Sequence, residues 1–292
     1  MVERITRAWP VAWLLIVAVD VVTGVTTTSP GPGMTVMGAL MFFLLMAYRF
    51  LVPGLILAPA PMLPICAVGM VLVAGRAGSL DEPLLSGLGD PSAWIGLVLA
   101  VGAIVLTLIA PFTGVREEVS SPMLFPLRDG RWLAAEGDGR ILNHHWPVPE
   151  QRGAWDLVRL GTRQRSRKGF RAVPDSAYFA FGAPVVAPCE GTVVRSVDGL
   201  PDGVADTDRP AGNHVVIDTG RELVVLAHLR HGSVAVSQGM TVAPGDPIGE
   251  VGNSGNSTEP HLHIHAERDG RPLRLRFTDI RRRVGKGAVV AV

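Results

Sequence analysis

Hydrophobic and polar positions are arranged differently in the two parts of the chain. Residues 1–112 are mainly apolar and hold only nine charged side chains. A membrane-spanning helix needs about 20 consecutive apolar residues. The pattern therefore predicts an N-terminal transmembrane region in the lipid bilayer, over residues 1–114. Its candidate spans are the apolar stretches 9–25, 35–52, 54–75 and 92–112.

Three or four crossings are compatible with this pattern. The first stretch contains Asp20, which is costly in lipid unless it faces other helices. Three prolines at 59–64 should distort the start of the third stretch. Arg4 and Arg7 favour a cytoplasmic N-terminus. Three crossings would then place the polar half outside the membrane, and four would place it inside.

Beyond residue 114 the pattern changes to short strands separated by turns. Residues 214–218 and 222–228 are rich in β-branched and leucine side chains, and the intervening 219–221 are typical of a hairpin turn. A further strand is predicted at 261–267, with a turn at 268–270. We therefore expect an all-β domain. The predicted divisions are connecting strands at 115–142, the β domain at 143–280 and a basic surface tail at 281–292.

Charge and cysteine content exclude some classes of protein. The net charge of +1 gives no global attraction to nucleic acid. The two cysteines, Cys66 and Cys189, lie in the apolar and polar halves respectively. Neither has a partner at metal-ligand spacing, so we expect two small apolar side chains and no disulfide framework.

Histidines carry the strongest chemical signal in the chain. All eight lie between positions 144 and 265. On a strand, His261, His263 and His265 would share one face, because side chains alternate. Neutral imidazole is a good zinc ligand, so this face predicts a metal site. His228 is then a candidate acid or base, and Asp156 a candidate carboxylate ligand.

Four motifs follow one another in a familiar order. They are GNHVVID at 212–218, LAHL at 226–229, GDPIG at 245–249 and GNSGNSTEPHLH at 252–263. Over residues 143–277 the chain resembles the lysostaphin-type zinc metallopeptidases, which cleave peptide bonds in bacterial peptidoglycan. The resemblance implies a small antiparallel sheet or open barrel of the duplicated hybrid motif type, with zinc as cofactor.

The resemblance also implies roles for individual residues. Asp156 and His263 would bind zinc, while His228 and His261 would serve catalysis. Arg152 stands where the family has a ligand histidine, and guanidinium cannot bind zinc.

A membrane-linked branch of the family has a Gln-Arg motif at this place, preceded by Asn-x-His. His145 is accordingly predicted as the third ligand, with His144 as the alternative. Arg152 and Asn213 are predicted to contact substrate.

Two readings of the function remain open. The first is a zinc metalloendopeptidase of the bacterial cell membrane, multi-pass, with its β domain outside the cytoplasm and peptidoglycan stem peptides or cross-links as substrate. The second is a catalytically degenerate relative that binds peptidoglycan or regulates a partner hydrolase. Arg152 favours the second reading, whereas His228, His261 and His263 favour the first. A transporter with an accessory domain has little support, because the apolar half shows no repeat.

Overall fold

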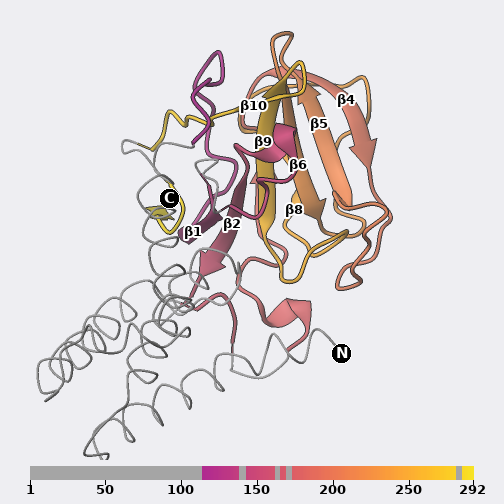
Figure 1. Ribbon diagram of the computed structural model, residues 1–292. Helices are drawn as coiled ribbons and strands as arrows, with labels where there is room; N and C mark the ends of the chain where they lie inside the picture. Colours follow the sequence, from indigo (N-terminus) through magenta and orange to yellow (C-terminus); the bar gives the residue numbers. More distant parts are fainter. Residues whose placement is uncertain (1–113, 138–142, 162–164, 169–172, 281–284) are drawn as a thin grey trace, which may run out of the picture. The chain divides into compact units, whose positions relative to one another are not determined.

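The computed structural model describes residues 114–137, 143–161, 165–168, 173–280 and 285–292. The four predicted membrane spans lie outside these residues. Within the described ranges, no helix combines the length and the apolar character needed to cross a bilayer. The described part is a β domain with short 3-10 turns (Figure 1).

Eleven strands and two 3-10 turns, η3 (Pro149–Gln151) and η5 (Asp175–Ala177), make up the described secondary structure. The strands are β1 Arg131–Glu136, β2 Trp155–Leu160, β3 Pro184–Val186, β4 Gly191–Val197, β5 Asn213–Asp218, β6 Leu223–Leu229, β7 Thr241–Val242, β8 Pro247–Glu250, β9 Leu262–Arg268, β10 Arg271–Leu273 and β11 Val289–Ala291.

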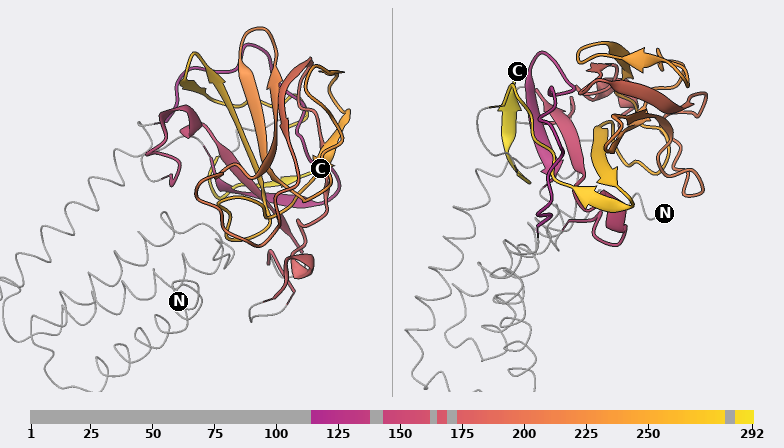
Figure 2. Two further views of the ribbon diagram at one scale, coloured as in Figure 1. Left: turned by 90° about the vertical axis from the view of Figure 1, so that its right-hand side faces the viewer. Right: turned by 90° about the horizontal axis from the view of Figure 1, so that it is seen from above.

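One large sheet organises the domain. Its order is β11-β1-β2-β9-β6-β5-β4-β7, with β10 paired to β9, and β3 and β8 form a second small sheet. Every pair of these named strands is antiparallel. Figure 2 shows that the strands follow a curved surface rather than a flat plane. The predicted all-β antiparallel fold is therefore confirmed for the described residues.

Local turn chemistry fixes the hairpins next to the histidines. Asp218 pairs with Leu223 across the turn that joins β5 to β6. Gly220 has a φ of 78° in this turn, a left-handed conformation that glycine adopts without steric cost. Arg268 pairs with Arg271 across the turn between β9 and β10. These turns set the registers of the β5–β6 and β9–β10 hairpins, and β6 and β9 pair with each other side by side.

Strand β9 is buried on both of its faces. Leu262, Ile264 and Ala266 are fully buried in the apolar core. Full burial of a leucine or isoleucine side chain contributes about 1.5–3 kcal/mol. His263 and His265 alternate with them and are also buried, at 4% and 5% exposure. The apolar residues thus fix the strand in the core, so that the histidines meet on its other face.

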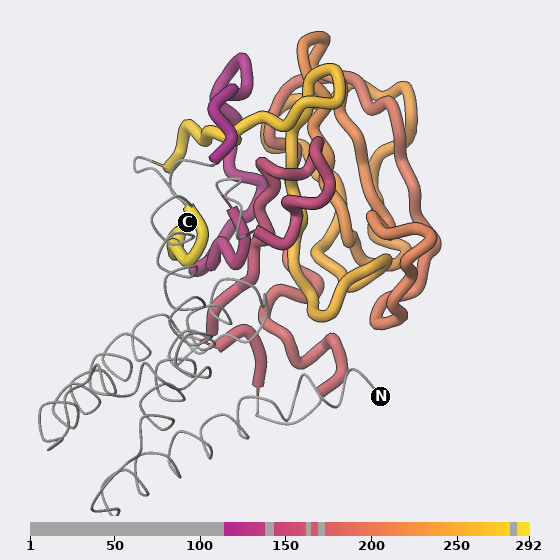
Figure 3. The backbone as a smooth tube through the Cα atoms, in the orientation of Figure 1, coloured from indigo at the N-terminus to yellow at the C-terminus, as the bar shows by residue number. Residues whose placement is uncertain are grey.

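The C-terminal residues join the sheet. Strand β11 pairs with β1, matching Trp132 with Val290. The predicted surface tail is therefore wrong for 289–291, because these residues complete the edge of the sheet. The segment 114–127 runs beside 274–278, with bridges between Glu118 and Arg274 and between Met123 and Phe277 (Figure 3).

Candidate metal centre

Asp156 lies at the centre of a cluster of histidines. It is the second residue of β2, is 3% exposed and pairs in register with His263 of β9. Directly opposite residues on neighbouring strands present their side chains to the same face. As a result, Nδ1 of His263 lies 3.0 Å from Oδ1 of Asp156.

A tight turn brings two further histidines to the same carboxylate. The backbone N–H of His145 donates to the side-chain oxygen of Asn143, and that of Trp146 donates to the Asn143 carbonyl. Nε2 of His145 then lies 3.0 Å from Oδ2 of Asp156. Nε2 of His144 lies 3.4 Å from the same oxygen. The fold-back of residues 146–151 therefore places both candidate ligands beside Asp156.

His228 and His261 lie on the other side of the cluster. Their ring centroids are 4.8 Å apart, and the His228 ring is 5.7 Å from that of His263. Nε2 of His261 is 3.7 Å from Oδ1 of Asp156. His228 has a φ of 61°, an uncommon backbone conformation for a side chain of this size. Such conformations are often found at functional sites.

Backbone carbonyls determine the tautomer of both rings. Nδ1 of His228 is 2.8 Å from the carbonyl oxygen of Ser254, and Nδ1 of His261 is 2.8 Å from that of Glu259. A carbonyl oxygen only accepts, so Nδ1 is the donor in each contact. The lone pair is left on Nε2 of each neutral ring. Both histidines are therefore prepared to accept a proton at Nε2.

Burial and mutual repulsion keep the central histidines neutral. Burial lowers the pKa of His263 to about 3, and that of His265 to about 4. Burial, followed by the charges of His261 and His263, holds the pKa of His228 well below its usual value. Neutral imidazole is the form that binds metal and accepts protons.

Asp156 is an anion in this environment. Burial alone would raise its pKa, but the charges of His145 and His261 and hydrogen bonds from His145 and His263 together hold it well below its usual value. A carboxylate together with imidazole nitrogens is a donor set that suits zinc.

The spacing of the donors fits a tetrahedral ion. Two ligands about 2.1 Å from such an ion are separated by roughly 3.4 Å. The His145–Asp156 and His263–Asp156 contacts, each 3.0 Å, are close to this separation. The nearest donor atoms of His144, His145 and Asp156 all lie within 4.8 Å of one another. The residues present thus fit a metal ion with mixed nitrogen and oxygen ligands.

Arg152 is turned away from this centre. It does not share a strand face with Asp156, because it caps η3 with φ −58° and ψ −25° and β2 begins only at Trp155. Its Nε donates to the carbonyl oxygen of Trp146, and its guanidinium lies 4.4 Å from the centroid of that ring. No ion pair joins Arg152 to Asp156 among the interactions described.

Asn213 has its side chain inside the fold. It is fully buried, its amide nitrogen donates to the carbonyls of Leu200 and Leu229, and its oxygen accepts from the N–H of Leu200. These bonds connect β5 to Leu229 at the end of β6 and to Leu200 in the loop that precedes β5. The structure therefore gives Asn213 a structural role.

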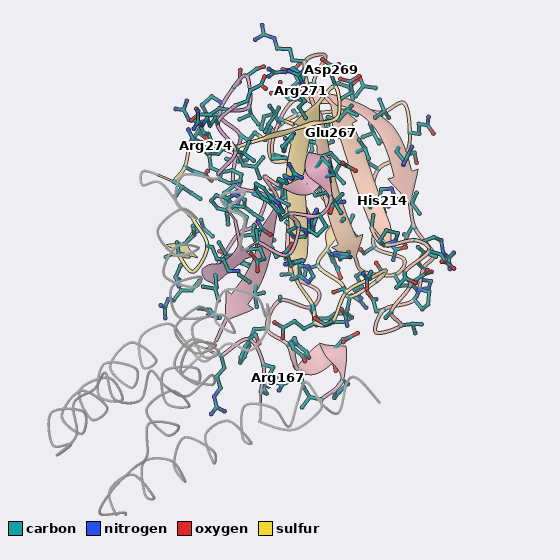
Figure 4. The ribbon with its side chains drawn as sticks, in the orientation of Figure 1. Arg167, His214, Glu267, Asp269, Arg271 and Arg274 are labelled. Carbon is teal, nitrogen blue, oxygen red and sulfur yellow. The ribbon has the colours of Figure 1, made fainter. Side chains whose placement is uncertain are left out.

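His265 contacts the cluster, as its place on the histidine face of the predicted strand indicated, although the family resemblance gave it no role. Its Nδ1 is 2.9 Å from Nε2 of His263, whose Nδ1 faces Asp156. Both nitrogens of His263 are thus in contact and its ring orientation is fixed. His214, which Figure 4 labels on β5, contacts the Gly212 carbonyl and none of these histidines among the interactions of the described residues.

Comparisons with known proteins found one family model and several similar proteins. The model of peptidase family M23 matches residues 176–275. An "Uncharacterized metalloprotease" of Haemophilus influenzae is 40% identical over 93 residues, covering 32% of this chain and 18% of the relative. "Peptidoglycan DD-endopeptidase ShyA" of Vibrio cholerae is 38% identical over 96 residues, covering 30% and 22%. The chain thus spans about a fifth of the length of these relatives.

Two solved structures are also similar. One is a zinc-containing peptidase from Vibrio cholerae, with 22% identity, a TM-score of 0.29 and coverage of 55% of this chain and 38% of that one. The other is the catalytic domain of lysostaphin from Staphylococcus simulans, with 21% identity, a TM-score of 0.25 and coverage of 36% and 77%.

The family match includes four of the clustered histidines and excludes two of the ligand candidates. His228, His261, His263 and His265 lie inside residues 176–275, whereas His145 and Asp156 precede them. The fold brings both groups to one point, through the pairing of β2 with β9. By its match and by the two curated relatives, this chain contains a peptidase family M23 domain.

Proposed function

We propose that this protein is a membrane-anchored zinc metalloendopeptidase that hydrolyses peptide bonds of bacterial peptidoglycan. The observation that carries the proposal is the contact of Asp156 with His145 and His263, each at 3.0 Å, beside His228 and His261. The relative named as a peptidoglycan DD-endopeptidase supports this class of substrate.

In this proposal His145, Asp156 and His263 hold the zinc ion. Zinc supplies Lewis acidity when bound, polarising a carbonyl and lowering the pKa of a water molecule. Three protein ligands leave a fourth position open, as catalytic zinc sites require. The contact of His265 with Nε2 of His263 keeps Nδ1 of that ring directed to the centre.

His228 and His261 move protons in this mechanism. Each has its lone pair on Nε2, because Nδ1 donates to a backbone carbonyl. Either ring can therefore take a proton from the attacking water and return it to the leaving amine. Once protonated, the same ring donates to the developing oxyanion and stabilises it. Once one ring has taken the proton it is a donor at Nε2, while the neighbouring ring keeps its lone pair and can act as a base.

Membrane anchoring belongs to the same proposal. Three of the four apolar stretches, as membrane crossings, would hold the β domain at the outer face of the bacterial cell membrane, where peptidoglycan lies. With Arg4 and Arg7 inside, this requires an odd number of crossings. Reporter fusions after Gly114 and after Arg49 test it. A cytoplasmic signal after Gly114 would contradict a role in wall hydrolysis.

Metal analysis of the full chain and its variants tests the centre itself. We expect about one zinc ion per chain in the parent and a loss of zinc in His145→Ala and His263→Ala. His261→Ala should keep the metal and lose hydrolysis of purified peptidoglycan. His214→Ala is the matched control, because this histidine lies outside the cluster.

The same measurement separates the degenerate alternative. If Arg152 marks a lost ligand, the parent protein would be free of metal and Arg152→His would create zinc binding. That result would overturn the hydrolase proposal and favour a peptidoglycan-binding module. If His145 is the ligand, Arg152→His should leave the zinc content unchanged.

A further inference from the structure

A second buried carboxylate lies next to Asp156. Glu136 is the last residue of β1, is fully buried and is paired in register with Asp156 of β2. Two acidic side chains at paired positions repel each other. Burial of a carboxylate is also costly unless the group is paired and hydrogen-bonded. Glu136 must therefore have compensating partners.

The C-terminal segment supplies the first of these partners. The N–H of Gly287 donates to the carbonyl oxygen of Ala134, and the N–H of Ala134 donates to that of Ala288. Together with the pairing of β11 and β1, these bonds hold residues 285–292 along β1. Nζ of Lys286 consequently lies 2.6 Å from Oε1 of Glu136.

His144 is the second partner and connects Glu136 to the metal centre. Its Nδ1 is 3.4 Å from Oε1 of Glu136, and its Nε2 is 3.4 Å from Oδ2 of Asp156. The His144 ring also packs on His145, with centroids 3.8 Å apart. A continuous set of contacts thus runs from Lys286 through Glu136 and His144 to Asp156.

Packing alone does not explain a glutamate at this position. Oε2 of Glu136 is buried and has no hydrogen-bond partner among the described residues. An unsatisfied buried oxygen costs about 1–3 kcal/mol, and an apolar residue of similar size would avoid this cost. Carboxylates that hydrogen-bond a histidine at a metal site, in contrast, fix the orientation of its ring.

We infer that the Lys286–Glu136 pair positions His144, and that His144 in turn holds Asp156 and His145 in place for the metal ion. Glu136 and Lys286 are positioning residues in this scheme, because neither contacts the proposed ligands directly. The C-terminal segment is then a part of the metal centre's support. The inference rests on the zinc site proposed above.

The test is zinc affinity, measured by chelator competition on the full chain. Glu136→Gln should weaken zinc binding by about tenfold to a hundredfold, the range found for outer-shell carboxylates. His144→Ala should weaken zinc binding to a similar extent. The double variant should bind zinc about as tightly as the weaker single variant, because Glu136 and His144 act through one set of contacts. Lys286→Arg keeps a donor at Glu136 and should retain most of the affinity.

Glu222→Gln is the matched control for the loss of a buried carboxylate. Glu222 is 5% exposed and pairs with Arg268 at 2.9 Å, at the opposite end of β6 from His228. The Glu222→Gln substitution should lower the stability of the metal-free protein without changing its zinc affinity. In the cobalt-substituted protein, Glu136→Gln should shift the visible absorption bands, whereas Glu222→Gln should not.

The outcomes separate this inference from the proposed function. A parent protein that binds no zinc would overturn both. A parent that binds zinc, with unaltered affinity and cobalt spectrum in Glu136→Gln, would overturn only the positioning role. Losses of zinc affinity that add up in the double variant would also overturn the positioning role.

Discussion

Glu259 should make the stability of the β domain depend on pH. It lies in the loop that leads to His261, is 8% exposed, and its buried Oε1 has no hydrogen-bond partner among the described residues. Burial raises the pKa of Glu259 to about 7, although the charge of Arg167 and a hydrogen bond from Ser166 oppose this shift. Arg167 lies beside η5, far from the labelled residues of the β9–β10 hairpin (Figure 4).

The size of the effect follows from linkage between protonation and folding. The pKa of this carboxyl is 4.5 in its unperturbed state and about 7 in the folded protein. The folded state therefore holds the proton more tightly, and stability is lost as the pH rises from the lower value through the higher one. One pKa unit corresponds to about 1.4 kcal/mol, so the full loss is about 3 kcal/mol.

Comparing Glu259→Gln with the parent isolates this contribution, because the amide stays neutral at every pH. We expect the variant to gain about 3 kcal/mol of unfolding free energy over the parent between pH 4.5 and pH 8. Urea denaturation of the full chain, followed by pulse proteolysis of the β domain, measures this difference. Glu250→Gln removes a charge from a partly exposed carboxyl and is the control. A stability difference that is the same at both pH values would refute the reasoning.

Three further predictions concern the thiol, a crowded glycine and the metal. Burial and the charge of Glu222 raise the pKa of Cys189 to about 12, so iodoacetamide at pH 8 should label it only after unfolding, as peptide mass spectrometry would show. Gly153→Ala should lower the free energy of unfolding, measured by urea denaturation, by about 1–3 kcal/mol, because the added Cβ would collide with the Leu273 carbonyl. Gly137→Ala should lower it less, since the added Cβ would meet no atom closer than 3.4 Å. Zinc at about 100 times its Kd should add about 2.7 kcal/mol of stability, and a melting temperature unchanged by chelator would contradict the zinc site.

The strands that the sequence predicted well are those with local signals. In the β5–β6 hairpin, β-branched residues flank a turn that contains Gly220. In the β9–β10 hairpin, alternation of leucine, isoleucine and histidine precedes a turn at Gly270. These features act within a few residues, so their effect on the backbone can be inferred without knowing the remainder of the fold.

The features that the sequence did not predict depend on distant partners. β11 is short, and it becomes a strand only because β1 offers a free edge. Glu136 gave no signal as a single acidic residue, since its importance comes from Lys286 and His144, which follow it by 150 and 8 positions. The conformation of Arg152 was not predictable from strand patterns either, because Pro149 starts a 3-10 turn that Arg152 caps, and β2 begins only at Trp155. Pairing across a sheet is non-local information that propensity alone does not contain.

The position of η3 explains how the proposed ligand His145 reaches Asp156 from 11 residues before it, although Arg152 stands at the place that the family resemblance gives to a ligand histidine. A fully extended segment of that length would separate the two residues by more than 30 Å, at about 3.3 Å per residue. Here the turn at Asn143 and the 3-10 turn at Pro149 reverse the chain, so that His145 returns to within 3.0 Å of Asp156. His145 lies in the turn at Asn143, and the following η3 packs against β9 and β10. In the proposed zinc site the nitrogen donor therefore comes from this turn and not from the strand that carries the carboxylate, while the guanidinium of Arg152 lies over the ring of Trp146.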